Sequence, residues 1–202
     1  MLSWFRKPIL PIAAQVKLLA DCGIRLRPGV TLADVQALPE RDALEREGYR
    51  ATLCALGTER LDGQGQTGCL SDDVWLLDTE CIEGPGSYVR VLTRIARMLP
   101  VEFPARAIAD SIRLDEYRAS VSFEIDETGH HWTQRAMDHW LDETLFLRIN
   151  HLVEAYPFPA RERARLLWQV PLGGQHRLII AATNADGRRL AQSCALAVRT
   201  YV

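Results

Sequence analysis

The strongest constraint on the fold is a strict alternation of apolar and polar residues between residues 117 and 125. The apolar members are Tyr117, Ala119, Val121, Phe123 and Ile125. Because successive side chains of a β-strand point to opposite faces, this pattern predicts a strand with one buried face and one wet face. After the sequence ETGHH, the apolar pattern returns over residues 132–137, which predicts an antiparallel hairpin.

Four further segments are expected to form strands. Residues 74–80, VWLLDTE, begin with four consecutive apolar residues, so we expect a strand that is buried on both faces and central in its sheet. Residues 165–170 and 176–182 are joined across PLGG, which predicts a second hairpin. Residues 49–56, YRATLCAL, are also expected to form a strand.

Helical periodicity and capping residues predict helices around these strands. Ser87 is expected to cap the clearest helix, which has an apolar side and an opposite side that carries Arg90, Arg94 and Arg97. The other expected helices cover residues 12–20, 32–38 after Thr31, 40–47, a segment from about Asp142, and a segment from about Ala185 to the chain end. Since strands and helices come in clusters, we predict the α+β class, with residues 1–202 as a single domain and helices packed on a largely antiparallel sheet.

The composition excludes several classes of protein. The 202 residues are 48% hydrophobic and 25% charged, which is typical of globular chains, and the net charge of −2 argues against general binding to nucleic acid. Five cysteines without a CxxC pair predict free thiols and a reducing compartment. Pro8 and Pro11 interrupt the apolar N-terminal run, and no segment approaches the roughly 20 apolar residues that span a bilayer. We therefore expect a cytoplasmic protein with no membrane contact and no cofactor.

One acidic group suggests a metal centre. Asp72, Asp73, Asp78 and Glu80 surround the strand at 74–80, and carboxylates so placed would suit Mg²⁺ in a phosphodiesterase-type hydrolase. The lysine that often accompanies such a site is missing, because no lysine follows Lys17. We therefore favour a turn before the strand and a solvated strand end, with no metal bound.

Other chemical motifs are weak. The glycine loop GQGQTG at 63–68 lacks the GK[ST] sequence and the following helix that phosphate cradles have. His130 and His131 would point to opposite sides of a strand, so with His139 they match no zinc pattern. No serine or cysteine lies in the sequence context of a nucleophile, and the arginine side of the helix at Ser87 is interpreted as a solvated face.

Three segments together resemble a family of small bacterial immunity proteins. They are LLADCGIRLRPGVT at 18–31, ERDALEREGYRATLCALGTE at 40–59 and LSDDVWLLDTECIEGPGSYVRVLTRIARM at 70–98, which fall in roughly the first half of the chain. Proteins of this kind are encoded beside secreted toxins, including type VI secretion effectors. The resemblance implies a cytosolic toxin inhibitor that acts by protein–protein interaction and has no chemistry of its own.

This resemblance favours a binding surface at the acidic residues over a catalytic centre. We expect loop 57–73 and its flanks to contact the toxin, with Asp72, Asp73 and Glu83 as the charged contacts. If the toxin is a nuclease, these carboxylates would face its basic groove. The alternatives are a metal-dependent hydrolase that uses the acidic group and a non-catalytic adaptor protein.

Overall fold

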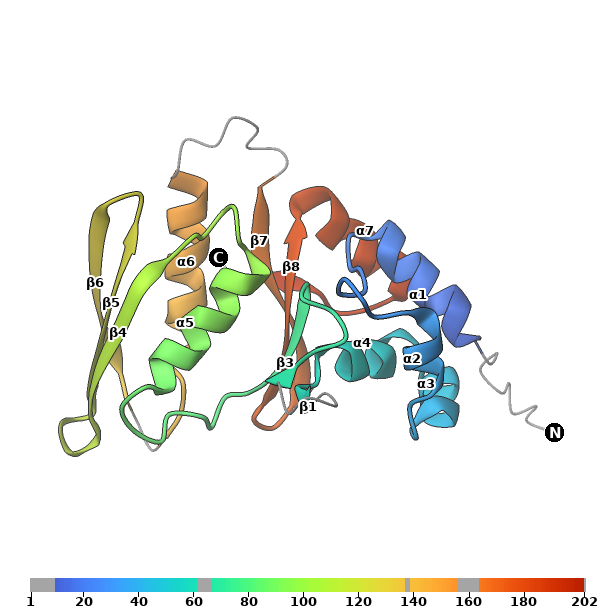
Figure 1. Ribbon diagram of the computed structural model, residues 1–202, viewed down its shortest axis with the longest axis horizontal. Coiled ribbons are helices and arrows are strands. Elements are labelled where there is room, and N and C mark those ends of the chain that lie inside the picture. The colour runs from blue at the N-terminus through green and yellow to red at the C-terminus, as the bar shows by residue number, and fades with distance from the viewer. Residues whose placement is uncertain (1–9, 62–66, 137–138, 156–163, 202) are drawn as a thin grey trace.

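The computed structural model describes residues 10–61, 67–136, 139–155 and 164–201 (Figure 1). Its helices are α1 (Ile12–Asp21), α2 (Leu32–Gln36), α3 (Arg41–Glu47), α4 (Tyr49–Gly57), α5 (Ser87–Met98), α6 (Thr144–Ala155) and α7 (Asn184–Cys194), with a short 3-10 turn η1 (Leu114–Glu116). Its strands are β1 (Arg60–Leu61), β2 (Thr67–Gly68), β3 (Val74–Asp78), β4 (Arg106–Arg113), β5 (Arg118–Ile125), β6 (Thr128–Arg135), β7 (Arg165–Gly173), β8 (His176–Thr183) and β9 (Arg199–Thr200).

Sheets and helices alternate in layers across the molecule. Figure 1 shows the three-stranded sheet β4–β5–β6 on one side, then α5 and α6, then the four-stranded sheet β3–β8–β7–β9, and finally α1 to α4 with α7. All strand pairs are antiparallel, and β1 pairs with β2 in a small separate ribbon. The α+β class with helices packed on antiparallel sheets is therefore confirmed.

The four-stranded sheet is enclosed between helices on both faces. Its centre is formed by β7 and β8, which make the hairpin that the sequence predicted, and the segment 178–182 of β8 is buried at every position. Alternate residues of a strand point to opposite faces, so this continuous burial requires cover on both sides. Helices α5 and α6 provide it on one side, and α4 and α7 on the other (Figure 1).

The central position expected for residues 74–80 is wrong. Strand β3 stands at the end of the four-stranded sheet and, within the described residues, pairs only with β8. Its apolar run is nevertheless buried because α4 packs directly on it: a Cβ built at Gly57 would lie 2.9 Å from the backbone nitrogen of Leu76. A run of apolar residues therefore indicates that both faces of a strand are buried. An edge strand is also buried on both faces when helices pack against it.

The strand expected at residues 49–56 is also wrong, because this segment forms α4. Apolar residues recur with both period two and period four there, so the pattern alone is ambiguous. Tertiary contacts decide the outcome. Thr52 and Leu53 are fully buried, and the Thr52 hydroxyl donates a 2.7 Å hydrogen bond to the side-chain carbonyl of Gln15 in α1.

The predicted alternation is confirmed within β5, but its first expected apolar member, Tyr117, lies outside the strand in a left-handed conformation and is 59% exposed. Ala119, Val121, Phe123 and Ile125 are all buried against the helical layer, while the residues between them are not. The partner strand begins earlier than expected, at Thr128, because residues 126 and 127 both have positive φ and form the hairpin turn. Two consecutive left-handed residues give a turn whose twist matches that of the flanking strands.

Strand β4 was not anticipated, and it also attaches this sheet to α5. The carboxylate of Asp110 in β4 accepts hydrogen bonds from the backbone N–H groups of Gly86 and Tyr88 at 2.8 and 2.9 Å. A carboxylate satisfies the unpaired N–H groups at a helix N-terminus and interacts favourably with the helix dipole. Ser87, expected to cap α5, instead accepts hydrogen bonds from the N–H groups of residues 83 and 84.

The helix predicted to run to the chain end stops at Cys194. Ala195 has a φ of 51°, a left-handed conformation that ends α7, and residues 199–200 then pair with β7 as β9. The C-terminal helix packs on the four-stranded sheet as expected: Gly187 lies so close to Trp168 of β7 that a Cβ would meet its ring at 2.5 Å.

The five cysteines are free thiols, as predicted. Burial raises the pKa of the Cys194 thiol to about 12 and raises the pKa values of Cys22, Cys54, Cys69 and Cys81 as well. Among the described residues, no helix is both long and apolar enough to cross a bilayer.

Candidate partner-binding site

The four carboxylates considered for a metal lie at opposite ends of β3. Asp72 and Asp73 precede the strand, Asp78 is its last residue, and Glu80 follows it. A strand rises about 3.3 Å per residue, so the two ends are roughly 15 Å apart. The four side chains therefore do not converge on one cation, and the described parts of the chain contain no group of three or more His, Cys, Asp or Glu that could hold a metal.

Asp73 is engaged within the protein. Its carboxylate accepts a 2.9 Å hydrogen bond from the backbone N–H of Arg25 and a 2.6 Å bond from the guanidinium of Arg165 in β7. Arg165 also donates to the carbonyl oxygen of Met98 at the end of α5. The Asp73 side chain is only 16% exposed, so it joins three parts of the fold. Its predicted role as a partner contact stays a prediction.

Asp72 is more exposed and faces Arg94 of α5. The Arg94 side chain is 8% exposed, and one of its nitrogens lies 3.4 Å from the Asp72 carboxylate. Its other terminal nitrogen donates to the carbonyl oxygens of Ser71 and Val74 at 3.3 and 3.0 Å. The carbonyl oxygen of Asp73 accepts a hydrogen bond from the backbone N–H of Ala181 in β8. Successive carbonyl groups of a strand point to opposite sides, so the Val74 carbonyl points away from the sheet. By donating to it, Arg94 covers the unpaired edge of β3.

The interpretation of the arginine side of α5 as a solvated face is therefore wrong for Arg94, although Arg90 and Arg97 are exposed. Glu83, the third expected contact, is exposed in the segment that precedes α5. Of the loop between residues 57 and 73, positions 62–66 lie outside the described residues, and these include most of the glycine motif. The structure thus places Asp72 and Asp73 next to each other, with Asp73 turned into the fold.

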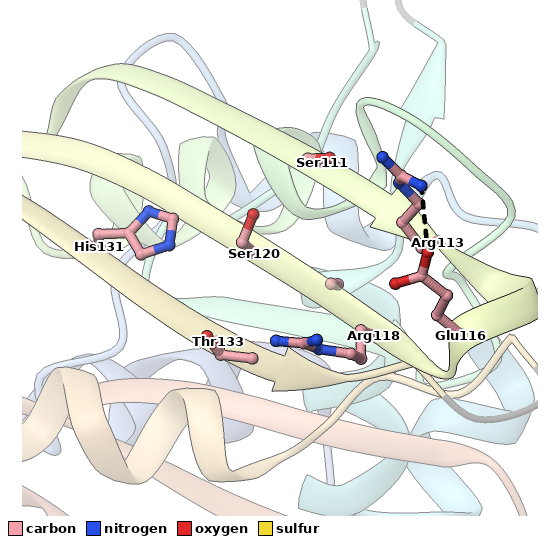
Figure 2. Close-up of a pocket in the computed structure, with 8 residues that line it drawn as sticks. Ser111, Arg113, Glu116, Arg118, Ser120, His131 and Thr133 are labelled. Atoms are coloured by element: carbon pink, nitrogen blue, oxygen red, sulfur yellow. Dashed lines mark hydrogen bonds and ion pairs between the residues drawn. The ribbon is translucent and has the colours of Figure 1, made fainter.

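A different surface stands out in the structure: the outer face of the β4–β5–β6 sheet. A recess of about 290 Å³ lies over its three strands, and Figure 2 shows the side chains that line it. We call this surface, with Ser111, Arg113, Glu116, Arg118, Ser120, His131 and Thr133, the outer sheet face. Ser111, Ser120 and Thr133 are aligned across the strands by the register, and their short side chains form the floor.

Three arginines lie side by side at one end of this face. Arg113 of β4 is paired in register with Arg118 of β5, which is paired with Arg135 of β6. Directly paired residues of antiparallel strands share a face, and like charges in such pairs are destabilising. Arg113 is partly neutralised by Glu116, at 3.1 Å (Figure 2). The row therefore costs folding stability and presents positive charge to solvent.

Aromatic residues flank the outer sheet face. Tyr117, which is 59% exposed, directly precedes Arg118, so it stands at the arginine end. His131 lines the recess, whereas His130 turns inward and stacks on Phe123, with ring centroids 5.1 Å apart. The expectation that these two histidines point in opposite directions is confirmed. Exposed tyrosine and arginine are the residue types most often found as energetic anchors of protein interfaces.

The sequence contained a signal for this surface that was overlooked. In RAIADSIR, residues 106–113, the half-buried positions are 108, 110 and 112, which is the period of a strand. Asp110 stands among them because it binds the helix N-terminus, and this polar residue obscured the apolar alternation. Without β4, the row of three arginines could not be assembled from the sequence.

No family model, curated protein or solved structure matches the chain in the comparisons with known proteins.

Proposed function

We propose that this protein is a cytoplasmic, non-catalytic inhibitor that binds and neutralises a cognate secreted toxin. The resemblance of its first half to immunity proteins of secreted effectors, including type VI effectors, supports this proposal. The observation that carries it is the arginine row of the outer sheet face, where like charges are held together at a cost to the fold. Residues retained against stability are expected at functional surfaces.

The positive charge of this surface supports a partner with an acidic surface. Arg118 and Arg135 are exposed, and arginine forms planar, two-pronged hydrogen bonds with carboxylates. The toxin is therefore expected to dock with an acidic surface and to place a side chain in the adjoining recess. This differs from the basic nuclease groove that Asp72 and Asp73 suggested, because Asp73 is already bonded to Arg25 and Arg165.

Co-expression with the candidate toxin of an adjacent gene tests the proposal. We expect the unmodified protein to restore cell survival, and the double variant Arg118→Glu/Arg135→Glu to lose protection and associate more slowly, with a weaker salt dependence. Neither side chain supports the core, so circular dichroism should match that of the unmodified protein. Thermal stability should be equal or slightly higher, because the repulsion between the paired arginines is removed.

Glu83→Lys is the matched control, because it reverses one exposed charge at the surface expected from the sequence. Protection that survives Glu83→Lys and fails in the arginine variant would support the outer sheet face. The reverse result would restore the sequence-derived surface. Phosphodiester hydrolysis by the protein alone with Mg²⁺ would refute a non-catalytic role.

A further inference from the structure

A second positively charged surface is a cleft between α5 and the β1–β2 ribbon, and it shares no residue with the outer sheet face. Its volume is about 410 Å³. The arginines that line it are Arg27, Arg90, Arg94 and Arg97. Three of them come from α5 at spacings of four and three residues, which places them on one side of that helix.

Arg27 reaches this cleft because residue 68 is glycine. A Cβ built at Gly68 would lie 2.1 Å from a terminal nitrogen of Arg27, so any other residue would displace the guanidinium. The backbone N–H of Arg27 donates a 2.9 Å hydrogen bond to the carbonyl oxygen of Leu70, which holds its segment beside the ribbon. The fourth arginine is therefore positioned by backbone contacts and by the absence of a side chain opposite.

The charges in the cleft are unbalanced. In the described part of the chain, the lining contains four arginines and two carboxylates, those of Glu59 and Asp72. Among the described residues, Asp72 pairs with Arg94, and Arg90 donates to the carbonyl oxygen of Cys81 at 3.3 Å. Positive charge gathered in a concave surface focuses the electrostatic field and attracts anions.

Arg94 adds an unsatisfied donor at the base of this arrangement. It is more than nine-tenths buried, and its Nε–H has no acceptor among the described residues although both terminal nitrogens are bonded. A buried donor without an acceptor costs free energy. The hydroxyl-bearing residues Thr67 and Thr93 also line the cleft, whereas the described residues of its lining include no aromatic ring on which a nucleobase would stack.

We propose that this cleft binds a compact phosphate-class anion with at least two negative charges, such as the diphosphate group of a small molecule. Arginine forks and threonine hydroxyls are the groups that bind phosphate oxygens, and the volume lies within the usual range for small-ligand sites. This site is independent of toxin binding. Anion binding in the cleft would stabilise the contact between α5, the β1–β2 ribbon and the start of β3.

Titration calorimetry with inorganic pyrophosphate tests this site. We expect one pyrophosphate to bind per chain, with an affinity that falls as ionic strength rises. Arg27→Ala and Arg97→Ala should each weaken binding about tenfold, the usual scale for one charge-assisted contact. Gly68→Ala should also weaken it, because it keeps every arginine but displaces the Arg27 guanidinium. Arg94→Ala is avoided, since that residue covers the edge of β3.

Arg46→Ala is the matched control, because it removes one exposed arginine from α3, outside the cleft. Equal pyrophosphate affinity in the Arg27→Ala/Arg97→Ala double variant and in the Arg46→Ala control would overturn the proposal, as would the absence of saturable binding. A poly-glutamate peptide that binds more tightly than pyrophosphate and loses affinity in the double variant would assign the cleft to an acidic protein segment instead. Thermal unfolding of each variant verifies that it is folded.

Discussion

The two larger sheets of this protein are built from the same antiparallel pairing, but they differ in how they are covered. The four-stranded sheet has helices on both faces, and residues 178–182 of β8 are buried without interruption. Within the residues that the structure describes, the three-stranded sheet has helices on one face only, and β5 alternates between buried and accessible residues. The central residues of the first sheet are therefore constrained by packing on both faces, whereas the outer-face residues of β5 remain accessible to solvent.

The charged residues of the two regions differ in their exposure to solvent and in how many segments they join. Asp73 and Arg165 are 16% and 24% exposed, and each has a further partner in another element. Arg113 and Glu116 are 66% and 47% exposed and stand three residues apart in one turn. A charge pair that is largely removed from water and joins distant segments acts on the fold, whereas an exposed local pair contributes little to it.

The largest expected effect comes from truncating a core residue of the four-stranded sheet. Ile180→Ala removes a fully buried side chain from β8 and should cost about 2–5 kcal/mol of unfolding free energy, because a cavity adds to the lost burial. Ser120→Ala, on the floor of the outer sheet face, should change it by less than about 0.5 kcal/mol. Urea unfolding of both variants measures the difference, and equal losses would show that the two sheets are equally constrained.

The same contrast explains how much of the fold could be predicted from the sequence. Strands β5, β7 and β8 were predicted because their side-chain patterns directly report which faces are covered. The edge position of β3 was not predicted, since Val74 and Leu77 are buried by α4 and the flanking layer whether or not a second strand is present. Strand β4 was missed because Asp110, on its inner side, serves the N-terminus of α5.

The candidate sites were harder to predict than the fold, because they depend on contacts between residues that are far apart in the sequence. The sequence identified Asp72, Asp73 and the arginines of α5, but pairing Asp73 with Arg165 requires contact across 92 residues. The row formed by Arg113, Arg118 and Arg135 requires the register of three strands. Local patterns contain neither kind of information, so residue types were identified while their partners were not.

An intermediate effect is expected from the charge network at the start of β3. Asp73→Ala leaves the Arg165 guanidinium and the Arg25 N–H without their acceptor and should cost about 1–3 kcal/mol. Glu116→Ala, which removes the exposed partner of Arg113, should cost less than about 0.5 kcal/mol. Chemical denaturation of the two variants makes this comparison, and a cost for Glu116→Ala that equals the cost for Asp73→Ala would remove the distinction between the two pairs.

The smallest effect concerns the joint between the three-stranded sheet and α6, which Asp142 forms. Its carboxylate accepts hydrogen bonds from the backbone N–H of Arg135 at 3.1 Å and from the N–H and hydroxyl of Thr144 at 3.1 and 2.7 Å. Burial raises the pKa of Asp142, but the hydrogen bonds from Thr144 and Arg135 outweigh burial and leave the pKa below its ordinary value. The charged carboxylate is thus favoured by the folded state.

The lowered pKa of Asp142 determines how the stability of this joint depends on pH. A carboxylate with a lowered folded pKa stabilises the protein fully above the unfolded value of about 3.9, and the contribution is lost as pH falls through the folded pKa. Asp142→Asn should therefore cost about 0.5–1.5 kcal/mol near neutral pH and progressively less under acid conditions. Thr144→Val, which keeps the carboxylate but removes one donor, should reproduce part of this loss. Denaturation series from neutral to acid pH measure both variants. A cost for Asp142→Asn that is independent of pH would show that the negative charge of Asp142 does not stabilise this joint.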